Sequence, residues 1–164
     1  MNCRIHNEAD NSVKSIIPLI KLENSVLTLK DCVIGADFNK NGTVIDSFNS
    51  IVNITDTMAS ANAVSYVSFI SAVKSRLSFK NSSINTNADT SVVISADGGS
   101  INALNNEFMI SGGTGRIAEL FGVKAAFKNN TFKARLTNAK TKILPLYADK
   151  AATLTDEKNI RQGF

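Results

Sequence analysis

The side chains that could carry out chemistry in this chain are mainly carboxylates and amines, because its 164 residues include a single histidine, His6. His6 lies in a polar N-terminal stretch, so neither a Ser-His-Asp triad nor a histidine-based metal centre can be built within one chain. The glycine run at 112–115 is not followed by the Lys-Ser/Thr pair of a phosphate-binding loop. We therefore predict no catalytic residue and no cofactor.

Two carboxylates, Asp31 and Asp56, are a candidate cation pair. They stand at the same place in two successive copies of a short motif, so they become neighbours if the copies stack. Adjacent carboxylates repel one another and could share a Ca²⁺ ion through their hard oxygen ligands. The simpler interpretation, which we favour, is that both are solvated turn residues and that the chain holds no metal.

Three lysines, Lys30, Lys80 and Lys128, share one position of the same motif. Stacked copies would align them in a column that could bind an acidic glycan, although lysines on exposed strands more often serve as solubilising charge. The net charge of +4 permits an acidic partner without demanding one. Because no block of consecutive Lys or Arg is present, we predict no nucleic-acid partner.

The motif itself recurs with a period of about 25 residues, and a fixed period of this length marks a stacked repeat architecture. A sixth, less regular copy ends at Asp156. The five regular copies are Leu27–Asp31, Val52–Asp56, Leu77–Asn81, Ile101–Asn105 and Ala125–Asn129.

Each copy alternates apolar and polar residues, as a half-buried strand does. Leu77 and Phe79 are expected to face inward, with Ser78 and Lys80 outward. A second strand-like segment precedes each motif and a short apolar piece follows it, so one repeat of three strands can walk once around a triangle. Stacked parallel strands then lie about 4.8 Å apart, and neighbouring turns bury a continuous core that no single turn could bury alone.

The last residue of each motif is expected to bend the chain between two strands. Asn and Asp tolerate the left-handed backbone angles of such a bend better than any residue except Gly. Stacked Asn side chains can also hydrogen-bond up the column. The predicted asparagine ladder consists of Asp31, Asp56, Asn81, Asn105, Asn129 and Asp156.

Strands of this length, a repeat of this period and an Asn/Asp column at one turn resemble the right-handed parallel β-helix, the pectate-lyase-like superfold. The resemblance covers about residues 15–156 and rests on architecture, not on a catalytic motif. It implies an all-β, single-stranded parallel solenoid of about six turns. Members of that superfold are mostly secreted or surface proteins. Many are polysaccharide lyases or hydrolases, and others are adhesins, autotransporter passengers and phage tail spikes.

By this resemblance, an enzyme would place acids, Lys and Arg along the groove formed by the first strand of each turn. That strand offers Asp46, Arg116 and Glu119 as candidate ligand-binding residues. Three turns separate Asp46 from Glu119, which puts them on the order of 14 Å apart. Paired glycosidase carboxylates are closer than this, so the enzyme interpretation is weak.

We divide the chain into a polar leader (1–14), the β-helix (15–156) and a polar tail (157–164). Residues 64–77 also fit an amphipathic helix, although the register of Leu77 favours a strand. Cys32 is expected to be a buried free thiol, and a disulfide to Cys3 in the leader stays open. The open ends of the solenoid expose unpaired strand edges, for which flanking domains or other subunits are candidate covers.

We therefore expect a non-catalytic, structural or adhesive module that presents one face to a polysaccharide or a surface protein. The alternative is a partial or divergent polysaccharide lyase or glycoside hydrolase. No run of 18 apolar residues is present, so we predict no membrane span. The first residues lack the apolar core of a signal peptide, so a secreted or cell-surface location requires that the sequence begins after processing.

Overall fold

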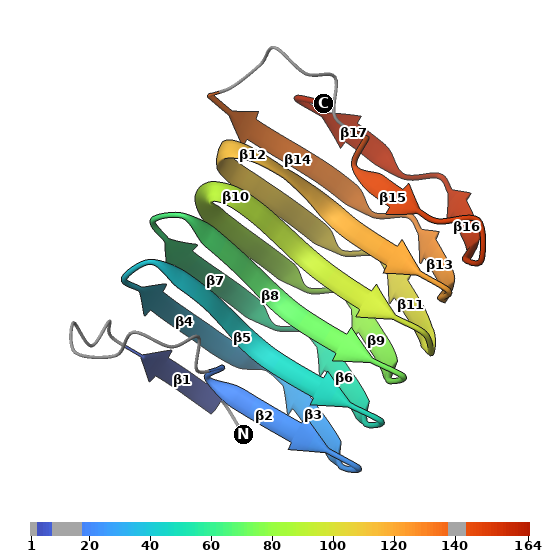
Figure 1. Cartoon of the computed structure of the whole chain (residues 1–164), viewed down its shortest axis with the longest axis horizontal. Helices are drawn as coiled ribbons and strands as arrows, with labels where there is room; N and C mark the ends of the chain where they lie inside the picture. The colour runs from blue at the N-terminus through green and yellow to red at the C-terminus, as the bar shows by residue number, and fades with distance from the viewer. Residues whose placement is uncertain (1–2, 8–17, 138–143) are drawn as a thin grey trace.

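The protein is a parallel β-helix of about six turns, as the sequence predicts (Figure 1). A computed structural model describes residues 3–7, 18–137 and 144–164. All regular elements in these residues are strands, and each strand pairs in parallel with its copy one turn away.

Three faces enclose the core of the solenoid, and each face is a stack of strands. Face 1 consists of β2 (Ile20–Glu23), β5 (Asn41–Phe48), β8 (Tyr66–Val73), the second halves of β10 (Ser83–Asp97) and β12 (Glu107–Phe121), and β15 (Leu146–Ala148). Face 2 is a separate sheet of β3 (Val26–Lys30), β6 (Ile51–Thr55), β9 (Arg76–Lys80), β11 (Ser100–Leu104), β13 (Lys124–Lys128) and β16 (Thr153–Glu157). Face 3 consists of β1 (Cys3–Asn7), β4 (Cys32–Phe38), β7 (Met58–Ala63), the first halves of β10 and β12, β14 (Thr131–Leu136) and β17 (Ile160–Gln162).

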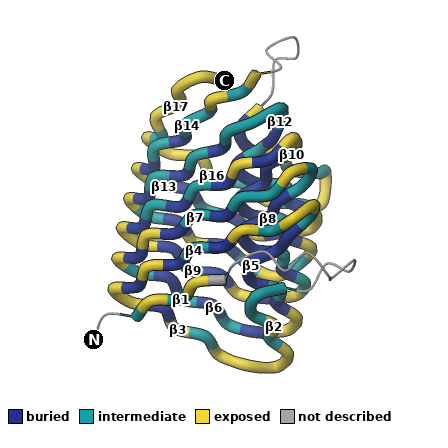
Figure 2. The backbone as a smooth tube through the Cα atoms, turned by 90° about the vertical axis from the view of Figure 1, so that its left-hand side faces the viewer, coloured by how far each residue is buried: buried dark blue, intermediate teal, exposed yellow. Residues whose placement is uncertain are grey.

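The inward side chains stack in columns, because in-register parallel strands place equivalent residues directly above one another. Leu77 of β9 pairs with Val52 on one side and Ile101 on the other, which confirms the predicted register of face 2. Phe79 is 1% exposed, and its ring contacts that of Phe108 edge-on at a centroid distance of 5.8 Å. Buried residues recur through the stacked turns in Figure 2 and belong to one core cluster, so the core runs along the solenoid.

Residues 64–77 form no helix. They contain β8 and the start of β9, and β8 pairs in register with β5 and β10. Phe69 and Ile70 are both fully buried. Their helix-like spacing arises because consecutive residues of this strand are buried, so the local pattern departs from strict alternation.

Two polar segments rich in Asn and Gly, 85–89 and 111–115, lie inside the continuous strands β10 and β12 although such residues are typical of turns. There the chain turns the corner from face 3 to face 1 without a break. Gly112 has a φ of 110°, and a Cβ at Gly112 or Gly115 would overlap a carbonyl oxygen of the turn below. The glycines therefore serve close backbone packing at the corner.

The last turn is shifted relative to the sequence alignment. Asp156 pairs with the inward residue Phe127, and Lys158, with a φ of 53°, follows at the turn where Asp156 was expected. Arg161 aligns with the inward residue Phe132 and forms an ion pair with Asp156. Charged side chains therefore stand at inward-column positions in this turn, an arrangement that discourages further strand pairing.

Strands also occur in the segments assigned to the leader and the tail. β1 adds to face 3 beside β4, and β17 adds beside β14. The strand-like segments that precede the first and the last motif, 15–20 and 142–147, lie partly outside the described residues.

The inward and outward assignments predict opposite outcomes for two neighbouring substitutions. Phe79→Asp places an unpaired carboxylate in the stacked core and should lower the free energy of unfolding by several kcal/mol. Lys80→Asp changes an exposed side chain and should leave it nearly unchanged. Urea unfolding of both variants measures this difference, and equal losses would contradict the assignment.

Candidate functional site

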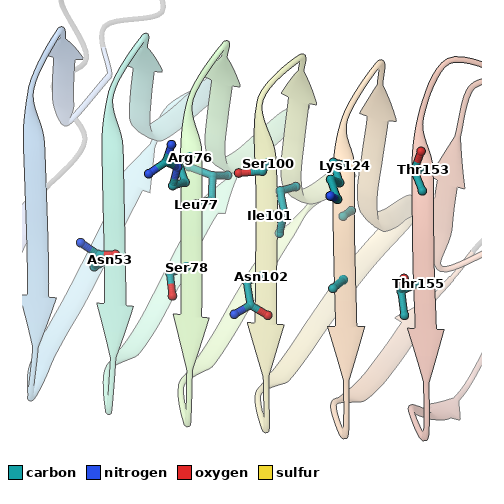
Figure 3. A pocket seen from close by; sticks show the side chains of 12 residues that line it. Asn53, Arg76, Leu77, Ser78, Ser100, Ile101, Asn102, Lys124, Thr153 and Thr155 are labelled. Carbon is teal, nitrogen blue, oxygen red and sulfur yellow. The ribbon is translucent and has the colours of Figure 1, made fainter.

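The outer surface of face 2 carries a shallow depression with a volume of about 360 Å³. Its floor is a column of small side chains, which leaves space between the longer residues on either side. Figure 3 shows two rows of residues crossing the strands, with Arg76, Ser100 and Lys124 in one row. The second row consists of Asn53, Ser78, Asn102, Ala126 and Thr155.

Four cationic side chains lie in or beside this depression. Arg76 and Lys124 both neighbour Ser100 in the strand register, so they stand two turns apart, or about 10 Å. Lys80 and Lys128 lie four residues further along the same two strands, with Leu104 between them. All four cationic side chains belong to exposed residues.

The outward positions of face 2 are predominantly basic. The outward positions of face 2 hold five basic residues and one acid, Glu157, which pairs with Lys128 at 3.0 Å. The chain has a net charge of +4, and these outward positions carry an excess of four positive charges, while Asp156 of β16 stands at an inward-column position. Among the described residues, Arg76, Lys80 and Lys124 form no ion pair.

The predicted lysine column is one edge of this surface. The register places Lys30, Thr55, Lys80, Leu104 and Lys128 in one line. The sequence does not reveal the opposite edge of the surface, which is the column that contains Arg76 and Lys124. The other four residues of this column are uncharged: Val26, Ile51, Ser100 and Thr153. Two cations among six residues give no periodic signal in the sequence.

On face 1, the register places Asp46, Ser71, Ser95 and Glu119 in one column. Two turns of the solenoid, which carry serine at this position, lie between the carboxylates. Asp46 and Glu119 therefore do not form a close acid–base pair. Glu119 instead lies 3.9 Å from the Nε of Arg116.

Arg116 in turn stacks on an aromatic side chain of the next turn. Its guanidinium carbon lies 4.8 Å from the ring centroid of Tyr147. The Tyr147 ring also contacts Phe121 at a centroid distance of 5.7 Å. This cluster is a partly exposed ion pair on an aromatic platform.

The residues of the predicted ladder adopt φ values between 50° and 56° at Asp31, Asp56, Asn81, Asn105 and Asn129. They are exposed, and the bond from Asn81 Nδ2 to Asp56 Oδ1 is 3.1 Å long. Asp56 therefore has an amide partner, and the described residues contain no group of three or more His, Cys, Asp or Glu side chains that could hold a metal.

A second ladder lies one residue further along the chain and is buried except at Asn159, which is half-buried. In each turn the backbone N–H at this position donates to the side chain of the next turn, over 3.4, 3.2, 2.9, 2.8 and 2.7 Å. These side chains satisfy the backbone donors where the strand ladder stops at the corner. The column consists of Cys32, Thr57, Ser82, Asn106, Asn130 and Asn159.

Sequence reasoning missed this ladder because its members differ in type, although all but Cys32 carry a side-chain oxygen. It also missed the preceding corner, where Asn24, Asn49 and Lys74 have positive φ and Asn49 Nδ2 donates to Asn24 Oδ1 over 2.7 Å. The buried Ser50 and Ser75 accept backbone N–H bonds beside it.

Comparisons with protein-family models, with curated protein sequences and with solved structures gave no match. In the part of the chain that the structure describes, no helix is long and apolar enough to cross a membrane.

The buried ladder predicts unequal effects for two Asn→Ala substitutions. Asn106→Ala leaves the buried N–H of Ser82 and the carbonyl of Phe79 without their partner, which should cost about 1–3 kcal/mol of unfolding free energy. Asn102→Ala removes an exposed side chain on face 2 and should cost much less. Chemical denaturation provides the comparison, and a costlier Asn102→Ala would rule out the ladder as a stabilising feature.

Tyr66 on face 1 predicts a loss of stability in alkali. Burial raises the pKa of Tyr66 above its usual value. A hydrogen bond with Ser68 lowers this pKa in part, and the negative charge of Glu119 raises it further. The folded state thus holds the phenol proton to higher pH than the unfolded state. This stabilisation is complete below about pH 10 and is lost as the pH rises through the folded pKa.

The measurement is urea unfolding from about pH 8 to 11 on the wild type and Tyr66→Phe. The wild type should lose more unfolding free energy above about pH 10 than the variant does. Phenolate absorbance gives a direct check, because the chain has two tyrosines and no tryptophan. A Tyr66 that titrates at or below the usual pKa would contradict the prediction.

Proposed function

We propose that this protein is a non-catalytic module of the secreted or cell-surface fraction that binds an extended, negatively charged polysaccharide along face 2. The observation that carries the proposal is a shallow depression lined by Arg76 and Lys124, whose other lining residues are uncharged and near which Lys80 also lies without an ion pair among the described residues. The role is adhesive or structural, since the same stacked strands form both the binding surface and the body of the solenoid.

The chemistry of the surface suits an acidic sugar chain. Arg76, Lys80 and Lys124 can neutralise carboxylate or sulfate groups, and Arg offers a bidentate fork for either. Ser78, Asn102 and Thr155 provide hydroxyl and amide groups for neutral sugar hydroxyls. The flat floor admits a linear polymer without requiring a deep cleft.

The same features set the strength of binding. Exposed ion pairs contribute roughly 0–1 kcal/mol each, so a short oligosaccharide should bind weakly. Affinity should rise with chain length, because a longer polymer contacts several turns at once. It should also fall as salt is added, since screening weakens exposed charge pairs.

The test compares binding of a polyuronate and a neutral glucan to the wild type and two matched double variants. Arg76→Glu/Lys124→Glu reverses both cations that line the depression and should weaken polyuronate binding roughly tenfold or more. Lys40→Glu/Arg135→Glu makes the same change in net charge at exposed residues outside face 2 and should retain most of the affinity.

Equal weakening by the two variants, or equal binding of the neutral glucan, would refute a specific site on face 2. The same samples can be followed for unsaturated uronate products by absorbance. Turnover would favour the alternative, a divergent polysaccharide lyase, and would direct mutagenesis to Asp46, Arg116 and Glu119 on face 1.

A further inference from the structure

The two cysteines of the chain lie side by side in the structure. Cys3 of β1 and Cys32 of β4 are direct partners in the strand register. Because the strands are parallel, both side chains point to the same side, toward the core. Cys32 is 4% exposed, and the partly buried Cys3 packs against the same core cluster.

These cysteines continue the buried ladder at its N-terminal end. The N–H of Cys32 donates to Thr57 Oγ1 over 3.4 Å, so Cys32 occupies the position held by Asn106 and Asn130 in later turns. Cys3 stands one turn below it in the same column. Hydrogen bonds connect neighbouring turns along the rest of this column. At its N-terminal end, the two neighbouring residues are both cysteines.

The strand that carries Cys3 is an edge strand of the described stack. β1 has five residues and pairs with β4 alone, whereas the strands inside the stack pair on both sides. An edge strand with one partner opens more readily than a strand inside a sheet. A covalent link at this position would therefore hold a strand that has one described partner.

We propose that Cys3 and Cys32 form an intramolecular disulfide that fastens β1 to the end of the solenoid. Adjacent parallel strands lie about 4.8 Å apart, within the roughly 4.4–6.8 Å that Cα atoms span in disulfides. The Cβ atoms must approach to about 3.5–4.5 Å. β1 can make this small shift because its other edge carries no described strand.

The oxidant is a low-molecular-weight disulfide such as oxidised glutathione. The Cys3 thiolate attacks one glutathione sulfur, forming a mixed disulfide and releasing one glutathione thiolate. The Cys32 thiolate then attacks the Cys3 sulfur and releases the second glutathione. The two cysteines lose two protons and two electrons, and the glutathione disulfide gains the electrons.

The order of these two steps follows from exposure and charge. Burial, and then the neighbouring Cys3 thiol, raise the pKa of Cys32, so the buried thiol is slow to attack a reagent in solution. Once Cys3 carries glutathione, Cys32 has a disulfide sulfur beside it. The resulting link closes a loop through residues 4–31 and restricts the unfolded chain.

The test incubates the full chain with reduced and oxidised glutathione mixtures and measures its intact mass under non-reducing conditions. We expect a monomer that has lost two hydrogens, with peptide mapping showing Cys3 linked to Cys32. Oxidation should raise the midpoint of thermal unfolding, reduction should reverse the shift, and Cys3→Ser should abolish it. Oxidised wild type should also resist removal of residues 1–7 by aminopeptidase.

The matched control moves the thiol by one residue. In Cys3→Ser/Arg4→Cys the new side chain lies at an outward position beside Val33, so it should not link to Cys32 under the same conditions. Equally fast linkage in this variant would overturn the proposed register. A stable glutathione adduct, a disulfide-linked dimer, or an oxidised chain with an unchanged unfolding midpoint would also overturn the proposal.

Discussion

The structure depends on one constraint, which is that the backbone of each turn must hydrogen-bond in register to the turn below. Parallel strands satisfy their donors and acceptors only if each circuit returns the chain to the same place about 4.8 Å higher. The nearly constant period of the repeat follows from this requirement. So do the corners, where the strand ladder is interrupted. There a residue with left-handed backbone bends the chain, and the next side chain accepts the backbone N–H of the turn below.

The same constraint decides what kind of functional surface the protein can form. Equivalent residues of successive turns stand in columns, so chemical groups are distributed along lines rather than gathered around a pocket. On face 2 the floor stays low because one column holds small side chains throughout, and cations occupy alternate turns on both sides. A surface of this kind matches a repeating, extended ligand better than a compact one. On face 1 the two carboxylates share a column but are separated by serines, which leaves Glu119 paired with Arg116.

Stacking has no intrinsic end, and the two described ends of this solenoid differ in chemistry. In the last turn, Asp156 and Arg161 pair at positions that hold Phe127 and Phe132 one turn earlier. Charged inward positions do not favour another apolar turn above them. At the other end, the column of hydrogen-bonding side chains finishes with Cys3 beside Cys32. One end therefore replaces core residues with an ion pair, and the other brings two thiols into the position of a ladder contact.

The sequence by itself determined the all-β class, the stacked period and the inward columns of face 2, because these depend on local alternation and on a turn residue that recurs at a fixed spacing. It also placed the lysine column, which repeats with the turn motif. It did not determine the alignment of the last turn, since Asp156 imitates the turn residue while Lys158 occupies the bend. Nor did it show that the glycines at 111–115 continue a strand, because the reason is the carbonyl oxygen of a neighbouring turn. Only the tertiary structure decided that Arg76 and Lys124 flank Ser100 on neighbouring strands. It also decided that Cys3 lies beside Cys32. Such contacts depend on which residues the closed turns bring one above another, and that register is set by backbone hydrogen bonds between segments distant in sequence.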